Sequence, residues 1–389
     1  MSVNNMSFEQ SSALLNQLHQ EVTGKTPISM QNEADFISVA TTTLKAGYDP
    51  VINAITQVVG RTIFSNRPYR RRFQGIQVDN QKFGAITRKL QVIDKDWEDS
   101  AQFDLTDGES VDMYTVNKPE VLQTNFYGAN HHQRHYTIFR DQLDSAFHSS
   151  AEFGQFLSMV TQNNLDVIEQ TRESIARAVI ANFVGGKMIG DSDSVIHLLT
   201  EYNSATGNSY TDTDIMKPEN YPAFIKWVYA RVEQLSSMMT ERSQKFQINV
   251  TGKEINRHTP RGDQRIYLNS QALAEITARV LADTYHDNFL TFAETEGVNF
   301  WQSIESPYSI NVTPSYLNTD GTIITGEAQT SDKLFGVMFD RDALGLTIIN
   351  EESAVTPYNA RGKYWNQWFT YTSRWWNDFT EKGIILLLD

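Results

Sequence analysis

Apolar residues recur at helical spacing through the N-terminal part of the chain. Residues 7–22 form one such stretch, which predicts an amphipathic helix that ends before Gly24. A second helical pattern runs over residues 35–58. Residues 61–73 then become basic and aromatic around Pro68, so we expect the helix to give way to extended chain there.

Strand-forming residues bracket a long polar segment farther along the chain. Residues 83–93 favour a strand, an acidic stretch with the turn signal Asp107-Gly108 follows, and residues 114–139 return with further strand formers. This pattern predicts a hairpin arm of roughly 60 residues with too few apolar side chains for a core of its own. Because an isolated two-stranded hairpin is barely stable in water, we expect a neighbouring chain to cover the arm.

The longest helical pattern begins near Ser149 or Ser150 and is predicted to end at Gly185-Gly186, where a C-terminal cap would lie. About 35 residues at about 1.5 Å each span roughly 50 Å, much more than a mean globular helix, and this length is typical of a strut. Its apolar positions recur mostly at intervals that share one helix face: Phe153, Phe156, Leu157, Val160, Val167, Ile168, Ile175, Val179 and Phe183.

A polar, turn-rich segment over residues 190–218 separates this helix from a mixed α/β region. There the pattern predicts a helix over 221–239, strands over 246–250 and 265–268, and a helix over 271–284. The tail contains the strand FGVMF, an aromatic block and a last strand GIILLL. Together these elements indicate an α+β protein.

Composition narrows the possible functions. The 389 residues are 40% hydrophobic, which predicts a folded, soluble protein with room for two or three cores. A net charge of −14 disfavours broad contact with nucleic-acid phosphates, so any such contact is expected to be local. The chain has no cysteine, which excludes disulfides and thiolate chemistry and fits folding in a reducing cytosol. Neither an export signal nor an apolar run of about 20 residues is present, so we expect no membrane insertion.

Metal and enzyme motifs give weak signals. His131, His132 and His135 are the best metal candidates, but on a strand His131 and His135 would share one face while His132 opposes them. The alternative is a polar strand in the return limb of the arm. P-loop, nucleophile-elbow and dinucleotide-binding patterns are absent. We therefore expect no catalytic residue, no metal and no cofactor.

Two clusters are candidate interface residues. The first contains Arg67, Arg70, Arg71 and Arg72, which combine guanidinium groups with aromatic neighbours. Such a mixture could hold phosphates or stack on bases, but in so acidic a chain salt bridges to carboxylates of a neighbouring subunit are favoured. The second contains Trp365, Trp368, Trp375 and Trp376. Sugar binding is one interpretation of the tryptophans, and anchoring in a core or an interface is the commoner one.

The order of these elements resembles that of the major capsid proteins of tailed bacteriophages with the Hong Kong ninety-seven (HK-type) fold. Two stretches carry the resemblance most specifically. The first is YTIFRDQLDSAF running into SSAEFGQFLSMVTQNNLDVIEQTRESIARAVIANFV, which is similar to the passage from extended loop to spine helix in that family. The second is GVMFDRDALGLTIINEESAVTPYNARGKYWNQWFTYTSRWWNDFTEKGIILLL, which is similar to the terminal segments of related podovirus-like heads.

The resemblance implies a division of the chain into five parts. These are an N-terminal arm with leading helices (1–66), an extended loop or E-loop (67–135), a peripheral domain with the spine helix (136–215), an axial α/β domain (216–345) and a C-terminal return to the peripheral domain (346–389). It also implies a subunit that assembles into hexamers and pentamers of an icosahedral virion shell in the host bacterial cytoplasm. No residue can be assigned to an isopeptide cross-link.

The resemblance further implies partners and leaves alternatives. The roughly 34 residues before Asp35 are too few for a large fused scaffolding domain. A separate scaffolding protein is therefore expected, with a portal, head decoration or tail proteins, and packaged double-stranded DNA bound without sequence specificity. An encapsulin-like compartment of the same fold is one alternative. A metal-dependent hydrolase using His131, His132 and His135 is a more remote one.

Overall fold

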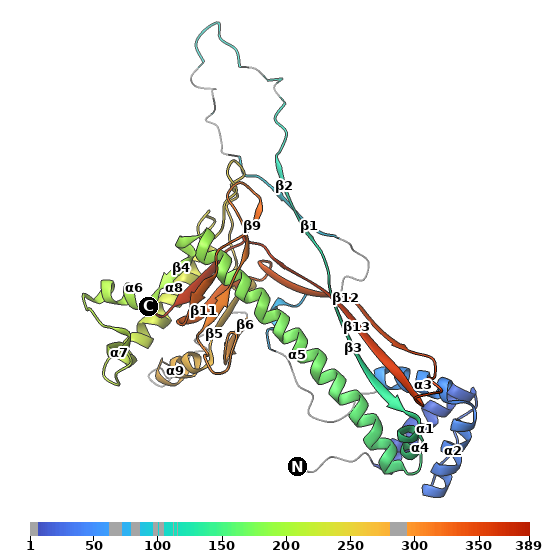
Figure 1. Cartoon of the computed structure of the whole chain (residues 1–389). Helices are drawn as coiled ribbons and strands as arrows, with labels where there is room; N and C mark the ends of the chain where they lie inside the picture. Colours follow the sequence, from blue (N-terminus) through green and yellow to red (C-terminus); the bar gives the residue numbers. More distant parts are fainter. Residues whose placement is uncertain are drawn as a thin grey trace.

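The computed structural model describes residues 7–61, 72–78, 86–95, 100, 105–111, 113–114, 116–280 and 294–389; within these ranges it leaves out the side chains of 56–61, 86, 157–165, 277–280 and 294. The protein is a mixed α+β structure. A long helix joins a helical cluster to a five-stranded sheet, a three-stranded sheet runs beside the helix, and an arm protrudes from the molecule (Figure 1). Among the described helices none is both long and apolar enough to cross a membrane.

The N-terminal helices form the cluster at one end of the molecule. They are α1 (Phe8–Thr23), α2 (Glu33–Lys45) and α3 (Tyr48–Arg61), and they pack with α4 (Arg140–Ala146) and the first turns of the long helix. The predicted helix over 7–22 is confirmed, and Gly24 ends it in the left-handed conformation. The single helix predicted over 35–58 is wrong. The helix α2 ends at Ala46-Gly47, where Gly47 has φ 121°, and a separate helix, α3, begins just before Pro50.

The long helix α5 covers Ser150–Gly190, and its 41 residues span about 60 Å. The predicted start is confirmed, since the Ser149 side chain accepts a hydrogen bond from the Glu152 N–H. The predicted end at Gly185-Gly186 is wrong, because both glycines lie inside the helix where neighbours approach closely. A Cβ on Gly185 would lie 2.6 Å from Val312 Cγ1, and one on Gly186 would meet the Phe379 ring. These glycines serve packing, not termination.

A five-stranded sheet forms the centre of the α/β part. Its strand order is β4 (Val195–His197), β14 (Gly383–Leu387), β11 (Leu334–Asp340), β5 (Gln264–Asn269) and β6 (Glu294–Val298). Ile385 and Leu387 face α5, whereas Ile384 and Leu386 face α6 (Leu198–Thr206), α8 (Tyr221–Thr240) and α9 (Ser270–Val280). Both faces are covered, which explains why the predicted strands FGVMF and GIILLL are continuously apolar.

The expected elements of this part are mostly present. The helix predicted over 221–239 and the strand over 265–268 are confirmed by α8 and β5. The helix predicted over 271–284 is confirmed to Val280, and 281–284 lie outside the described residues. The strand predicted over 246–250 is wrong: Phe246 and Ile248 enter different cores, but Phe246 has φ 68° and the segment joins no sheet. A short helix α7 (Asp212–Ile215) lies in the turn-rich segment.

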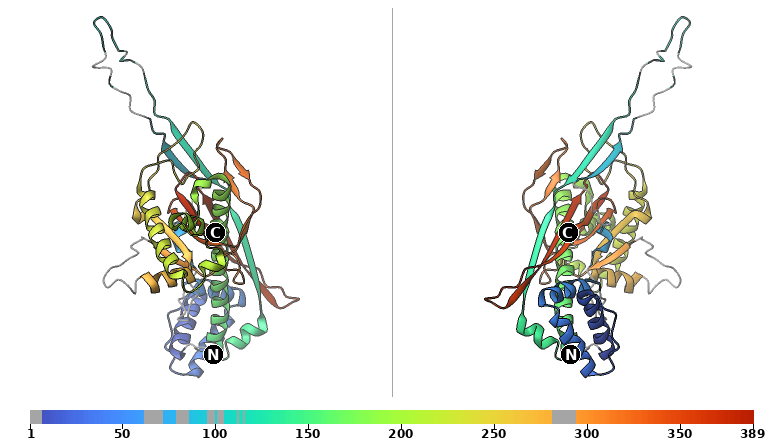
Figure 2. Two further views of the ribbon diagram at one scale, coloured as in Figure 1. Left: turned by 90° about the vertical axis from the view of Figure 1, so that its left-hand side faces the viewer. Right: turned by 90° about the vertical axis from the view of Figure 1, so that its right-hand side faces the viewer.

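A long antiparallel sheet runs beside α5 and leads into the arm. Its order is β12 (Leu344–Val355), β13 (Tyr364–Asn377) and β3 (Asn130–Phe139). Only Gly128-Ala129 separates β3 from β2 (Val121–Tyr127), which pairs with β1 (Ile86–Val92). The predicted strand over 83–93 is confirmed by β1 for residues 86–92, and 83–85 lie outside the described residues. The predicted hairpin is shorter than expected, because the end of its return limb pairs with β13. Figure 2 shows the arm extending away from the N-terminal helices.

Small elements complete the structure. Two short antiparallel strand pairs lie against the end of α5. They are β7 (Ile310–Val312) with β10 (Gln329–Ser331) and, between them in the chain, the hairpin of β8 (Ser315–Leu317) with β9 (Ile323–Thr325). Among the described residues, single turns of 3₁₀ helix cover Gln74–Ile76, Ser192–Ser194 and Arg261–Asp263. Gln77 bridges to Leu346 of β12, so the chain is attached to the long sheet just before the arm begins.

Candidate functional site

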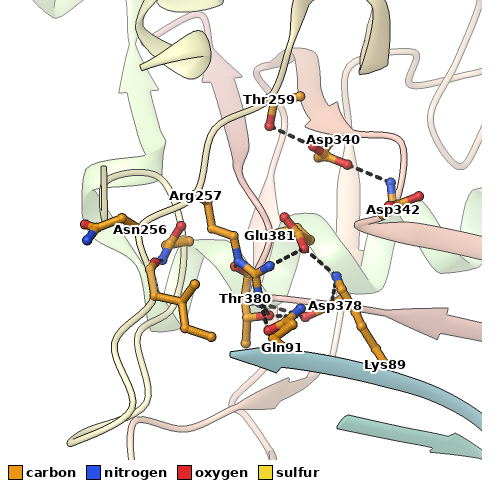
Figure 3. A network of polar contacts seen from close by, with 12 residues as sticks. Lys89, Gln91, Asn256, Arg257, Thr259, Asp340, Asp342, Asp378, Thr380 and Glu381 are labelled. Atoms are coloured by element: carbon orange, nitrogen blue, oxygen red, sulfur yellow. Dashed lines mark hydrogen bonds and ion pairs between the residues drawn. The ribbon is translucent and has the colours of Figure 1, made fainter. Parts of the chain in front are cut away.

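A buried network of charges joins the root of the arm to the rest of the protein (Figure 3). Lys89 of β1 places its Nζ 2.5 Å from Asp378 Oδ2 and also contacts Glu381, and both acids lie in the turn between β13 and β14. Arg257 approaches the same turn from the opposite side, with its Nη1 2.9 Å from Glu381 Oε1. Arg257 also donates to Gln91, two residues beyond Lys89 on the same face of β1.

For each ionisable group of this network, burial and the neighbouring opposite charges shift the pKa in opposite directions. Burial opposes ionisation of Asp378, but the Lys89 ammonium and hydrogen bonds from Thr380 outweigh it, so the pKa of Asp378 lies below its usual value. Burial raises the pKa of Glu381, against the attraction of Lys89 and Arg257. Burial also disfavours the Lys89 ammonium, yet its two acidic partners raise the pKa of Lys89. The Lys89–Asp378 pair is therefore ionised over a wide pH range.

Two further lysines lie buried behind the turn. Lys187 of α5 donates from Nζ to the Phe246 carbonyl at 2.8 Å and lies 3.3 Å from Asp191. Lys382 donates to the Glu241 carbonyl at 2.8 Å. Burial lowers the pKa of Lys187 to about 8, and burial likewise lowers the pKa of Lys382 to about 8. These lysines hold the 241–246 loop against the sheet that supports the arm.

The arm root has a second polar attachment and an aromatic one. Asp94, just beyond β1, accepts a hydrogen bond from the Asn256 N–H at 3.0 Å and pairs with Arg242. Burial works against ionised Asp94, but these two contacts lower its pKa. On the neighbouring strand, Phe126 packs on Trp376 with ring centroids 5.9 Å apart. The root is therefore fixed to its own chain along both strands.

A groove of about 800 Å³ lies under the arm root. Its walls come from β2, from the β8–β9 hairpin, from residues 250–253 and from the end of β13. Tyr127, Ile323 and Trp375 line it, and each of these apolar side chains is exposed.

The predicted arginine cluster is only partly described. Arg67, Arg70 and Arg71 lie outside the described residues. The guanidinium of Arg72 donates to the Gly297 carbonyl, and its backbone N–H donates to Glu173 at 3.3 Å. Arg72 thus bonds within its own chain, while Arg177 pairs with Glu173 at 2.6 Å beside it.

The four predicted tryptophans all lie on β13 but in different surroundings. Trp365 is buried in the helical cluster, where its indole N–H donates to Asp49 at 2.5 Å. Trp368 stacks on His135 with ring centroids 4.4 Å apart. Trp375 and Trp376 lie at the arm root. The structure therefore makes Trp365 a core anchor and leaves the other three partly accessible.

The three candidate histidines lie along β3 beside β13. His131 and His135 share the exposed face, and His132 lies on the opposite one. His131 Nδ1 is 3.1 Å from the Thr372 hydroxyl, and His132 stacks on Tyr371. Within the described part of the chain, no three His, Asp or Glu side chains are grouped to hold a metal ion. Each histidine instead contacts a side chain of β13.

Lys89, Arg257, Asp378 and Glu381 were not singled out from the sequence. Charged residues in strands and turns ordinarily face water, so nothing in their local pattern marks them as buried. One available signal was the pair Glu381-Lys382 directly preceding the apolar run GIILLL. Polar groups directly before a fully buried strand need partners, and here Lys89 of the arm root is the partner of Glu381.

Both the sequence and the fold of this chain are similar to those of phage capsid proteins. The model of a family described as Phi29-like phage major capsid protein matches residues 12–378. The fold is similar to a chain in a capsid structure of Staphylococcus phage Andhra, with a TM-score of 0.57 and 12% identity, covering 84% of this chain and 87% of that one. It is also similar to a chain in the structure of head fiber and inner core protein gp22 of native bacteriophage P68, with a TM-score of 0.56, 12% identity and coverage of 84% and 87%. No curated protein sequence matches the chain.

Proposed function

The chain belongs to the Phi29-like phage major capsid protein family and forms the shell of a phage, and from this premise we propose that it adopts the HK-type capsid fold and assembles through its arm. The observation that carries the proposal is the arm itself. Its root is bound to the protein by Lys89, while residues beyond the root project away from every core (Figure 1). Such an arm gains stability when another subunit covers it.

The proposal includes the five-part division. Residues 67–135 serve as the extended loop, 136–215 as the peripheral domain with α5 as spine helix, and 216–345 as the axial domain. Residues 1–66 serve as the N-terminal arm with leading helices, and residues 346–389 return to the peripheral domain. The proximity of Trp365 to Asp49 supports the last assignment, because it joins the two terminal parts in one core.

The partners remain part of the proposal. The subunit forms hexamers and pentamers around double-stranded DNA, with a separate scaffolding protein, a portal and head decoration or tail proteins. It assembles in the host bacterial cytoplasm and acts in the virion as a structural protein without catalytic activity. Arg67, Arg70 and Arg71 are proposed to meet carboxylates of a neighbour, whereas Arg72 bonds within its own chain. The family match favours a phage shell over an encapsulin-like compartment, and the packing of the histidines on β13 disfavours a metal hydrolase.

Electron microscopy of the purified protein, with and without a coexpressed scaffolding protein, tests the proposal. Closed shells are expected from the wild type. A variant in which residues 96–116 are replaced by a short Gly-Asn turn keeps the arm root and should remain folded by circular dichroism but form no closed shells. Closed shells from this variant would show that the arm is not the assembly contact.

A further inference from the structure

The groove under the arm root is bordered by the edge of a strand. Its described lining includes all of residues 122–130, which contain most of β2, but no residue of β1. Because successive side chains of a strand point to opposite faces, a wall that contains every residue of a strand is an edge and not a face. The edge of β2 that faces away from β1 therefore forms one wall of the groove.

The backbone groups on this edge are available for hydrogen bonds. Residues directly opposite each other in an antiparallel pair alternate between bonded and non-bonded pairs. The Ile93 N–H donates to the Glu120 carbonyl at 3.0 Å, so the pair formed by the next residues, Val92 and Val121, is not bonded. Alternation along β2 then turns the N–H and C=O groups of three further residues away from β1: Gln123, Asn125 and Tyr127. In the described part of the chain these outward backbone groups have no partner.

The groove has room for one extended chain. At about 3.3 Å per residue, the seven residues of β2 extend over about 23 Å. A volume of about 800 Å³ along this length leaves a cross-section of roughly 35 Å². One strand in packed sheets takes up about 4.8 Å by about 10 Å. The open groove therefore holds the backbone of a single strand, but not a two-stranded hairpin such as the arm of another copy.

The side chains around this edge favour an apolar and uncharged occupant. Tyr127, Ile323 and Trp375 line the groove and are 78%, 67% and 37% exposed. Lys253 and Asp320 also line it and are exposed, one of each sign, so the free charges at the groove select no net charge. Alternate side chains of an added strand would lie against the apolar groups.

We propose that an extended segment of a different protein adds to the free edge of β2 as a third strand of the arm root. Backbone hydrogen bonds to Gln123, Asn125 and Tyr127 would supply affinity, and alternate apolar side chains against Trp375 and Ile323 would supply specificity. Such an occupant covers a strand edge that would otherwise invite unspecific pairing. The contact goes beyond the proposed shell function, because its occupant is not a copy of this chain.

Binding of short peptides to the purified full-length subunit tests the inference. The probes are fluorescein-labelled heptapeptides of the pattern Thr-X-Thr-X-Thr-X-Thr, with every combination of Ile, Val, Tyr and Trp at X. Fluorescence anisotropy measures their affinity, and at least one sequence is expected to bind. N-methylation of one alternating set of its amides should abolish binding and methylation of the other set should not, because only one set of N–H groups faces the partner strand.

Asn125→Pro is the decisive variant of the subunit. The N–H that it loses points away from β1, so pairing of β1 with β2 stays intact while the proline ring blocks the free edge. The affinity for the peptide should fall about tenfold or more. Asn125→Ala is the matched control, since it removes the same side chain but keeps the backbone N–H, and it should bind the peptide like the wild type.

The possible outcomes each support or overturn the proposal. Absence of binding by every peptide, equal binding of the two methylated forms, or unchanged affinity in Asn125→Pro would overturn strand addition at this edge. Self-association of the wild type that Asn125→Pro abolishes, measured by analytical ultracentrifugation, would make a second copy the occupant and would also overturn it. If Asn125→Pro does not fold, the comparison of the two methylated peptides still decides.

Discussion

Lys89 Nζ lies 2.5 Å from Asp378 Oδ2, although the two residues are 289 positions apart in the chain. This ion pair joins the first strand of the arm to the turn before β14, and Asp378 is almost completely buried. A buried pair of this kind contributes little net stability compared with an apolar substitute, but breaking it leaves an uncompensated charge. The pair therefore fixes the direction in which the arm leaves the protein.

Lys89→Met should reduce the free energy of unfolding of the isolated subunit by about 3 kcal/mol, because it leaves Asp378 buried without its cation. Urea denaturation followed by circular dichroism measures the change. Lys118→Met is the matched control, since Lys118 is an exposed lysine of the same arm, and should change stability by less than about 0.5 kcal/mol. Equal effects of the two substitutions would contradict a special role for Lys89.

The buried lysines predict an unusual pH dependence. Burial lowers the pKa values of Lys187 and Lys382 from 10.5 to about 8. Between these values the unfolded chain holds protons that the folded chain has released, so these groups make the free energy of unfolding increase with pH. The urea midpoint should therefore rise between about pH 8 and about pH 10.5.

Lys187→Met and Lys382→Met should each remove part of this rise, while Lys118→Met should leave it unchanged. The measurement is the slope of the urea midpoint against pH for each variant. A wild-type midpoint that stays flat or falls through this window is incompatible with lowered pKa values at the two lysines.

Gly186→Ala should destabilise the subunit even though alanine favours helix. The added Cβ would meet the buried Phe379 ring and lie 2.9 Å from Tyr316 Cβ. Overpacking of this kind costs about 1 to 3 kcal/mol, more than the roughly 1 kcal/mol gained in helix propensity. Gly262→Ala is the control, because nothing lies within 4 Å of its Cβ position and its φ is negative or extended. A gain in melting temperature for Gly186→Ala would show that the close packing is wrong.

Ser174→Pro tests α5 as a strut. Proline there removes an internal backbone hydrogen bond and clashes with the preceding turn, which costs about 3 kcal/mol or more and kinks the helix. Electron microscopy should show aberrant particles or none. Ser174→Ala loses only the hydroxyl bond to the Gln170 carbonyl and should form shells like the wild type. Uniform shells from the proline variant would mean that a straight α5 is not needed for assembly.

Much of the fold could be predicted from local pattern. The apolar period of α5 and the continuous apolar runs of β11 and β14 follow from burial on one helix face or on both sheet faces. Where prediction failed, a distant contact was decisive. Gly185-Gly186 has the pattern of a helix end, but Val312 and Phe379 pack against these glycines inside the helix. The return limb of the arm pairs with β13 instead of extending the hairpin.

The candidate site was less predictable than the fold. Trp365 stood out as one of a tryptophan cluster, and its burial against Asp49 agrees with a core anchor. Lys89 and Asp378 did not stand out, because a charged residue in a strand or turn usually faces water. The two residues are 289 positions apart and are buried together only in the folded chain, so no local periodicity predicts their burial.

The position of β14 between β4 and β11 has a consequence for the order of folding events. Its partners are strands distant in sequence, and such long-range pairings form late because loop closure must precede them. The turn that holds Lys89 immediately precedes β14, so it acquires its final place only when that strand inserts. The arm is therefore expected to gain its fixed direction in the slowest step of folding, which would keep incompletely folded chains from entering a growing shell.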